Sequence, residues 1–119
     1  MTQAGQDFSM WQGENKKLLV QVLDCNDDPV NLTTISDLEW VMQTGFYLVD
    51  PKVIKKLGTG IEITDALDGR FEVELDPGDT EELAGFLQHE ARLVDMDGNK
   101  YTVMIGRAKI EVSITNASP

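Results

Sequence analysis

The sequence predicts an all-β domain, an antiparallel sandwich of about seven to eight strands with one short connecting helix. Three observations support this fold class. Apolar and polar residues alternate with a period of two along most of the chain, turn-forming residues separate the alternating runs at regular intervals, and a single stretch has the pattern of a helix. With 119 residues, the chain has the length of one domain. We expect this domain to span 1–119, with flexible ends at 1–6 and 115–119.

Four runs predict the clearest strands, because one side of each run is apolar and the other is mostly polar. The predicted core sides are, in chain order, Leu18, Val20 and Val22; Leu38, Trp40 and Met42; Phe71, Val73 and Leu75; and Leu87, His89, Ala91 and Leu93. Trp40 is expected to be the large core residue between the sheets, and the alternative is an exposed binding aromatic. Shorter candidate strands lie at 8–11, 53–57 and 61–64.

The apolar pattern of the C-terminal run changes phase. Its apolar residues are first odd-numbered and then even-numbered: Tyr101, Val103 and Ile105, followed by Ala108, Ile110, Val112 and Ile114. A strand keeps both sets on the core side only if it slips by one residue, and glycine suits a bulge. We therefore predict one long bent strand, or two strands that switch sheets, with the slip at Gly106-Arg107.

Turn-forming sequences separate these runs. They are Asn26-Asp27-Asp28-Pro29, Asp68-Gly69, Asp76-Pro77-Gly78-Asp79 and Asp97-Gly98. Asp97-Gly98 is typical of a tight hairpin turn whose two central residues both need positive φ. The short helix is expected at 79–85, with Asp79 or Thr80 as its cap, Glu81 and Glu82 in its first turn and Gly85 at its end.

Composition excludes several classes of protein. Ten Lys and Arg against 21 Asp and Glu give a net charge of −11, which argues against nucleic acid and anionic membranes as partners. One cysteine, Cys25, forms no internal disulfide and cannot build a Cys-rich zinc site. The N-terminus lacks a basic segment followed by an apolar run, so no secretory signal is expected. No apolar stretch approaches the ~18 residues of a membrane span.

Few residues are candidates for chemistry. His89 is the single histidine and shares a side with Leu87, Ala91 and Leu93, so we interpret it as a partly buried, hydrogen-bonded structural residue. Spacing alone leaves a Ser-His-Asp arrangement open through Ser9, Ser36 or Ser113, but none of these serines lies in a nucleophile-elbow motif. Acidic neighbours disfavour a reactive thiolate at Cys25.

Acidic clusters raise the question of calcium. Asp95-Met96-Asp97-Gly98-Asn99 and Asp24-Cys25-Asn26-Asp27-Asp28 offer hard oxygen ligands, but an EF-hand loop needs a Glu where this chain has Met104. Glu72 and Glu74 belong to an acidic run at 65–82 and are expected on a solvated strand face, while Lys52, Lys55 and Lys56 form a small basic spot that the acidic face of a neighbouring subunit could contact. We expect no catalytic residue, metal or cofactor.

The order of short motifs resembles the N-terminal domain of phage baseplate upper proteins and related Ig-like modules of phage and prophage virions. The resemblance covers about 8–114. It is carried by the following segments, in order: Gln12-Gly13-Glu14-Asn15-Lys16-Lys17-Leu18, Asn31-Leu32-Thr33, Glu39-Trp40-Val41-Met42, Gly60-Ile61-Glu62-Ile63, Gly69-Arg70-Phe71-Glu72-Val73, Leu75-Asp76-Pro77-Gly78-Asp79-Thr80, Gly85, Glu90-Ala91-Arg92-Leu93-Val94-Asp95, Asp97-Gly98, Gly106 and 110–112. Leu87 departs from the family, which commonly has Tyr at this position.

The resemblance implies an Ig-like sandwich and a function in a virion. The family domain usually continues into a C-terminal part that reaches toward a receptor-binding protein, and the resemblance does not extend to host-receptor binding by this chain. It implies a non-enzymatic tail, baseplate or fibre-attachment module, made in the bacterial host cytoplasm, which contacts other virion proteins and symmetric copies of itself. A head-decoration or neck component is an alternative. A carbohydrate- or calcium-binding module is another, for which Trp11 and Phe46-Tyr47 are the candidate loop aromatics.

Overall fold

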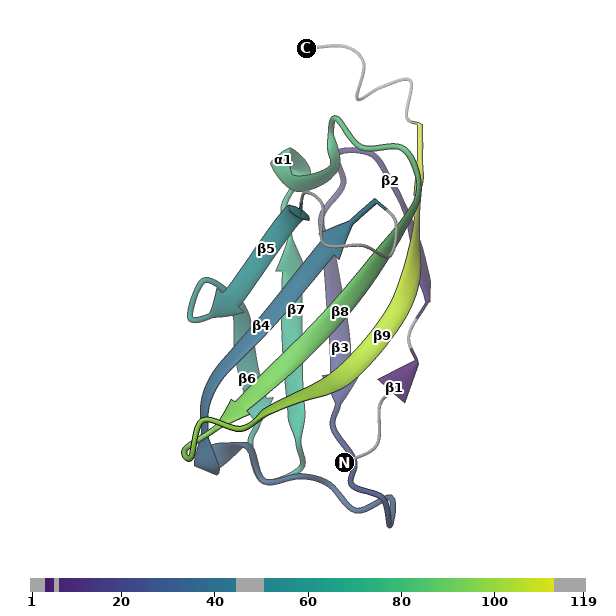
Figure 1. The fold of residues 1–119 in the computed structure, drawn as a ribbon. Helices are drawn as coiled ribbons and strands as arrows, with labels where there is room; N and C mark the ends of the chain where they lie inside the picture. The colour runs from purple at the N-terminus through teal and green to yellow at the C-terminus, as the bar shows by residue number, and fades with distance from the viewer. Residues whose placement is uncertain (1–3, 6, 45–50, 113–119) are drawn as a thin grey trace.

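The strands join into one mixed sheet that curls into a nearly closed barrel shape (Figure 1). The computed structural model describes residues 4–5, 7–44 and 51–112. Along the sheet the strand order is β1-β9-β8-β4-β5-β6-β7-β3, and β2 pairs with β9 farther along that strand. The strands are β1 (Ala4–Gly5), β2 (Phe8–Trp11), β3 (Lys16–Gln21), β4 (Ile35–Gln43), β5 (Pro51–Leu57), β6 (Gly60–Asp65), β7 (Arg70–Leu75), β8 (Gly85–Asp95) and β9 (Lys100–Glu111).

The period-two pattern places the core correctly. All four predicted core sides are buried, and Trp40, at the middle of β4, has no exposed surface. Figure 1 shows β4, β8 and β9 in front of β3, β6 and β7, and their inward side chains form one hydrophobic cluster. The three shorter candidate strands are also present, as β2, β5 and β6.

The direction of pairing differs from the prediction in three places. The predicted sheets were wholly antiparallel, whereas β1 and β2 both pair parallel to β9, and β5 pairs parallel to β6. The alternating pattern cannot reveal this difference, because side chains alternate with the same period in parallel and antiparallel strands. The β5–β6 pairing covers only two residue pairs, Lys56 with Gly60 and Leu57 with Ile61, so the sheet is weakly joined there.

The C-terminal run is one long strand, the first of the two predicted alternatives, but its slip lies elsewhere. Ala91 pairs with Met104 and Arg92 pairs with Thr102, which leaves Val103 as the extra residue of a bulge. Val103 and Met104 are therefore both buried, and from there on the even positions face the core. Tyr101 and Ile105, predicted to be inside, are partly exposed, and so is Val112; Ile114 lies outside the described residues.

Two local predictions were wrong about turns. Gly98 has φ +86°, but Asp97 does not have the positive φ that the predicted turn needs, because Asp27 is the one non-glycine residue with positive φ in the described ranges. The connection between β8 and β9 at 96–99 is therefore a longer loop and not a two-residue turn. The helix, α1 (Pro77–Thr80), begins earlier than predicted. Pro77 suits a first helical position because that position needs no N–H, and the Asp76 N–H donates to Asp79 Oδ2 at 2.7 Å.

The N-terminal segment of the chain and the segment before β4 are held in different ways. Of the predicted flexible ends, 1–3, 6 and 113–119 lie outside the described residues, and Ala4–Gly5 pairs with Met104 and Ile105. A short 3-10 helix, η1 (Leu32–Thr34), precedes β4, and the Asn31 side chain accepts the N–H of Thr33 at its start. This interaction gives the Asn31-Leu32-Thr33 sequence a structural role.

Candidate functional site

His89 occupies the core position that the sequence predicts. Its side chain is buried beneath the β4–β8–β9 layer, and Trp40 Nε1 donates to His89 Nδ1 at 3.1 Å. The Phe8 ring meets the imidazole edge-on, with ring centroids 5.0 Å apart. A ring nitrogen that accepts a hydrogen bond carries no proton, so this contact suits the neutral imidazole.

Neither of the two candidate serines that the structure describes is arranged as a nucleophile beside His89. The Ser36 hydroxyl donates to the carbonyls of Val94 and Asp95 at 3.2 and 2.9 Å, which joins the start of β4 to the end of β8. Ser9 is exposed, because it follows Phe8 in β2 and its side chain lies on the opposite side of the strand. Ser113 lies outside the described residues, and Cys25 is exposed in the loop after β3.

Both acidic clusters have a local structural role. Asp24 Oδ1 accepts the N–H groups of Asn26 and Asp28 at 2.8 and 3.0 Å. Asp95 Oδ1 accepts those of Asp97 and Asn99, both at 2.9 Å, and the Asn99 hydrogen bond is the main reason that the pKa of Asp95 is lowered. Within 4–5, 7–44 and 51–112, no group of three or more His, Cys, Asp or Glu side chains is placed to hold a metal ion.

The structure separates Lys55 from the other two lysines of the predicted basic spot. Lys55 is mostly buried, and its Nζ lies 2.8 Å from Asp79 Oδ2 in α1. Lys56 points to the other side of β5, where its Nζ lies 3.5 Å from Glu39 Oε2. Lys52 is exposed near the start of β5, so Lys55 alone is shown to leave the predicted spot, because adjacent strand residues face opposite sides of the sheet.

The outer face of β4, β5, β8 and β9 carries a broad open hollow of about 780 Å³. We call it the outer hollow. Most of its lining residues lie on the side of these strands that faces away from the core, although His89, whose side chain is buried on the core side, is also among them. The lining residues are Asp7, Glu39, Val41, Gln43, Pro51, Ile54, Gln88, His89, Glu90, Arg92, Ile105, Gly106 and Arg107.

Strand register explains how a row of three apolar residues and one glutamate, which we call the apolar row, crosses the outer hollow. Ile54 pairs with Val41, Val41 with Glu90, and Glu90 with Ile105, so these four side chains lie in line across four strands. Ile54 and Ile105 are 52% and 46% exposed, so the row presents apolar surface to the hollow. Beside the row, Arg92 Nη2 lies 3.9 Å from Glu90 Oε1, so the floor offers both apolar contact and charges of both signs.

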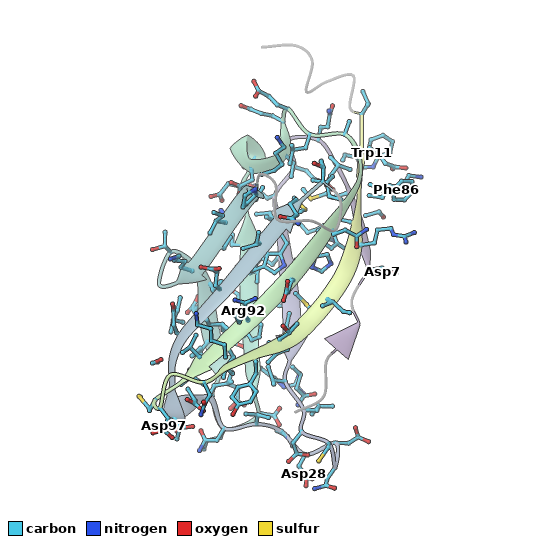
Figure 2. All side chains as sticks on the ribbon, in the orientation of Figure 1. Asp7, Trp11, Asp28, Phe86, Arg92 and Asp97 are labelled. Carbon is cyan, nitrogen blue, oxygen red and sulfur yellow. The ribbon has the colours of Figure 1, made fainter. Side chains whose placement is uncertain are left out.

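An exposed aromatic surface adjoins the outer hollow. We call Trp11, Phe86, Arg107 and Lys109 the cationic–aromatic patch; it spans β2, β8 and β9, and Figure 2 shows Trp11 and Phe86 at the same end of the molecule. Arg107 Cζ and Lys109 Nζ lie 6.0 and 5.8 Å from the Phe86 ring centroid.

Sequence analysis named Trp11 but missed Phe86. The feature of the sequence that could have identified Phe86 is an aromatic residue on the polar side of its strand, in phase with Gln88, Glu90 and Arg92. Phe46 and Tyr47 lie outside the described residues.

Comparisons with known proteins leave the chain without an assigned family. Neither a scan against models of known protein families nor a search of curated proteins finds a match. Among the described residues, no helix has the length and apolar character needed to cross a membrane. The candidate site therefore depends on the geometry of the outer hollow and of the cationic–aromatic patch.

Proposed function

We propose that this chain is a non-enzymatic structural module of a phage or prophage particle, a tail, baseplate or fibre-attachment component that acts through protein–protein contacts. The observation that carries the proposal is the outer face of β4, β5, β8 and β9, where isoleucines and arginines line a broad open hollow and the exposed Phe86 adjoins it through Arg107. Aromatic residues and arginine dominate the binding energy of protein interfaces. The motif order that resembles phage baseplate modules supports the particle setting, with assembly in the bacterial host cytoplasm.

We further propose that the fold is Ig-like. In an Ig domain of the variable type, one sheet holds strands G, F, C and C′ and the other holds B, E and D. The sheet order here matches if β9, β8, β4 and β5 are G, F, C and C′, and β3, β7 and β6 are B, E and D. The two-pair junction between β5 and β6 would then be the boundary between the two sheets.

The position of Trp40 agrees with this assignment. Ig domains carry a buried Trp on strand C, which packs against a disulfide between strands B and F. Trp40 is buried on β4, the proposed strand C, and its indole N–H donates to His89 on β8, the proposed strand F. In this chain, the hydrogen bond between Trp40 and His89 would join the tryptophan to strand F, where antibody domains have the disulfide.

A virion function is tested by finding the protein in particles. Particles from a strain that carries the gene should be purified by density gradient and analysed by quantitative mass spectrometry. The chain should band with tail or baseplate proteins at a fixed number of copies per particle. A constant ratio to capsid proteins in tail-less heads would instead support a head-decoration or neck component. Absence from particles, with the protein abundant in the soluble lysate, would refute the proposal.

A carbohydrate-binding function is the second candidate, because Trp11 and Phe86 expose their rings on one surface. A glycan array probed with the wild type and with Phe86→Ala separates the two functions. Binding that Phe86→Ala abolishes would favour carbohydrate recognition. An attachment module should give no binding with either protein.

A further inference from the structure

Opposite layers of the molecule carry complementary surfaces. The cationic–aromatic patch lies on the outer side of β2, β8 and β9, and Trp11 and Phe86 are 53% and 64% exposed there. Both cations are near the Phe86 ring, and three carboxylates border the patch: Lys109 lies 3.4 Å from Glu111, Asp7 Oδ1 accepts the Arg107 N–H, and Glu14 Oε1 accepts the Trp11 N–H. The patch thus combines two exposed aromatic rings with two cations in a chain of net charge −11.

The outer side of β6 and β7 is acidic. We call Glu62, Glu72 and Glu74 the acidic face. Glu62 and Glu72 are directly opposite each other in the β6–β7 ladder, and like charges in that arrangement destabilise a sheet. Lys17 of β3 pairs with Glu72 at 3.6 Å, and Arg70, on the same side of β7, pairs with Asp68, so neither Glu62 nor Glu74 belongs to a described ion pair. A cation from outside the chain would relieve this repulsion.

The two surfaces cannot meet within one molecule. Figure 1 shows β8 and β9 in front and β6 and β7 behind, so the patch and the acidic face point away from each other. Two copies can bring them together if the patch of one copy contacts the acidic face of the next. The net negative charge makes copies repel in general, and the two cations and two exposed rings of the cationic–aromatic patch offset that repulsion where the patch meets the acidic face.

We propose that copies of this chain associate head to tail, with the cationic–aromatic patch of one copy on the acidic face of its neighbour. Trp11 and Phe86 would supply most of the contact energy, while Arg107 and Lys109 would fix the register against the carboxylates. A contact between two different surfaces forms a closed ring or an open filament, and it does not form a two-fold dimer. This inference rests on the proposed structural function and names one of the partners, a second copy of the chain.

Two variants test the contact, because each one removes a single surface. Phe86→Ser with Lys109→Ser takes one ring and one cation from the patch, and Glu62→Gln with Glu74→Gln takes two of the three charges from the acidic face. The control, Met96→Ser with Lys100→Ser, changes an exposed apolar residue and a lysine at the other end of the β8–β9 pair. Circular dichroism and thermal unfolding establish that each variant folds.

Analytical ultracentrifugation over a concentration series gives the result. The wild type and the control should assemble beyond a dimer, and each surface variant alone should associate about tenfold more weakly or remain monomeric. An equimolar mixture of the two surface variants should stop at a one-to-one heterodimer, because each partner keeps one working surface. A monomeric wild type, or a mixture that forms no heterodimer, would overturn the inference. If the protein is nevertheless found in particles, the proposed function survives and only the head-to-tail contact fails.

Discussion

At the scale of single residues, the contact between Trp40 and His89 is the main polar interaction of the core. Both side chains are buried, and the indole N–H donates to His89 Nδ1. The sequence predicted both positions, because each residue shares a side of its strand with apolar neighbours. It could not predict the hydrogen bond, because β4 and β8 are far apart in sequence and their register is set by the whole sheet.

Trp40→Phe should destabilise the protein by about 1–3 kcal/mol, because it keeps an aromatic ring but leaves a buried ring nitrogen without its donor. Urea unfolding followed by circular dichroism measures this loss. His89→Leu with Trp40→Phe removes both partners, so the double variant should lose less stability than the two single variants together. Additive losses would show that the hydrogen bond contributes nothing.

Asp95 should make stability depend on pH near the acid limit. Its folded-state pKa is lowered, chiefly by the Asn99 N–H, so the ionised form stabilises the folded state. This stabilisation is complete above the unfolded pKa of 3.8 and disappears as the pH falls through the folded pKa. The advantage of the wild type over Asp95→Asn in urea unfolding should therefore shrink below about pH 4. Asp97→Asn, in the same loop, is the control, and an advantage for Asp95 that stays constant with pH would contradict this explanation.

At the scale of elements, period-two alternation identified the strands, because each strand has one buried side. The β9 slip was misplaced for a physical reason. A bulge buries two consecutive residues, here Val103 and Met104, and in sequence Gly106 offers the more conspicuous signal. The outer hollow could not be predicted either. Ile54, Val41 and Ile105 come from three strands and form one row only through the register of the sheet.

The turn before β7 depends on Gly69. Its φ is +68°, and an added Cβ would lie 2.6 Å from the Val22 carbonyl oxygen and 2.9 Å from that of Val30. Gly69→Ala should therefore cost on the order of 2 kcal/mol or more, from the left-handed backbone and from the clash. Gly78→Ala is the matched control, because a Cβ there meets nothing within 4 Å, and its stability should change little. Equal thermal unfolding of the two variants would contradict the role assigned to Gly69.

At the scale of the whole molecule, a curled sheet buries one core and leaves its outer surfaces free for contact. The sequence predicted the β class and the core because these follow from local patterns of burial. The parallel pairing of β1 and β2 with β9 follows from the path of the chain through the whole sheet, which alternation does not encode. Phe86 was missed because sequence analysis sought binding aromatics in loops, whereas this aromatic lies within a strand.

The outer hollow is the surface that the proposed attachment function needs most. Ile54→Asp with Ile105→Asp places two charges on its apolar row, and the fold should tolerate them because both side chains are already half exposed. Leu67→Asp with Met96→Asp introduces the same charges at exposed turn positions and serves as the control.

The decisive measurement is the amount of each variant in purified particles, when a phage that lacks its own copy of the gene is grown on a host that supplies the variant. The wild type and the turn control should be incorporated equally, and the variant of the outer hollow should fall by about tenfold or more. Incorporation of a folded hollow variant at the wild-type level would contradict the claim that this face attaches the protein to the particle.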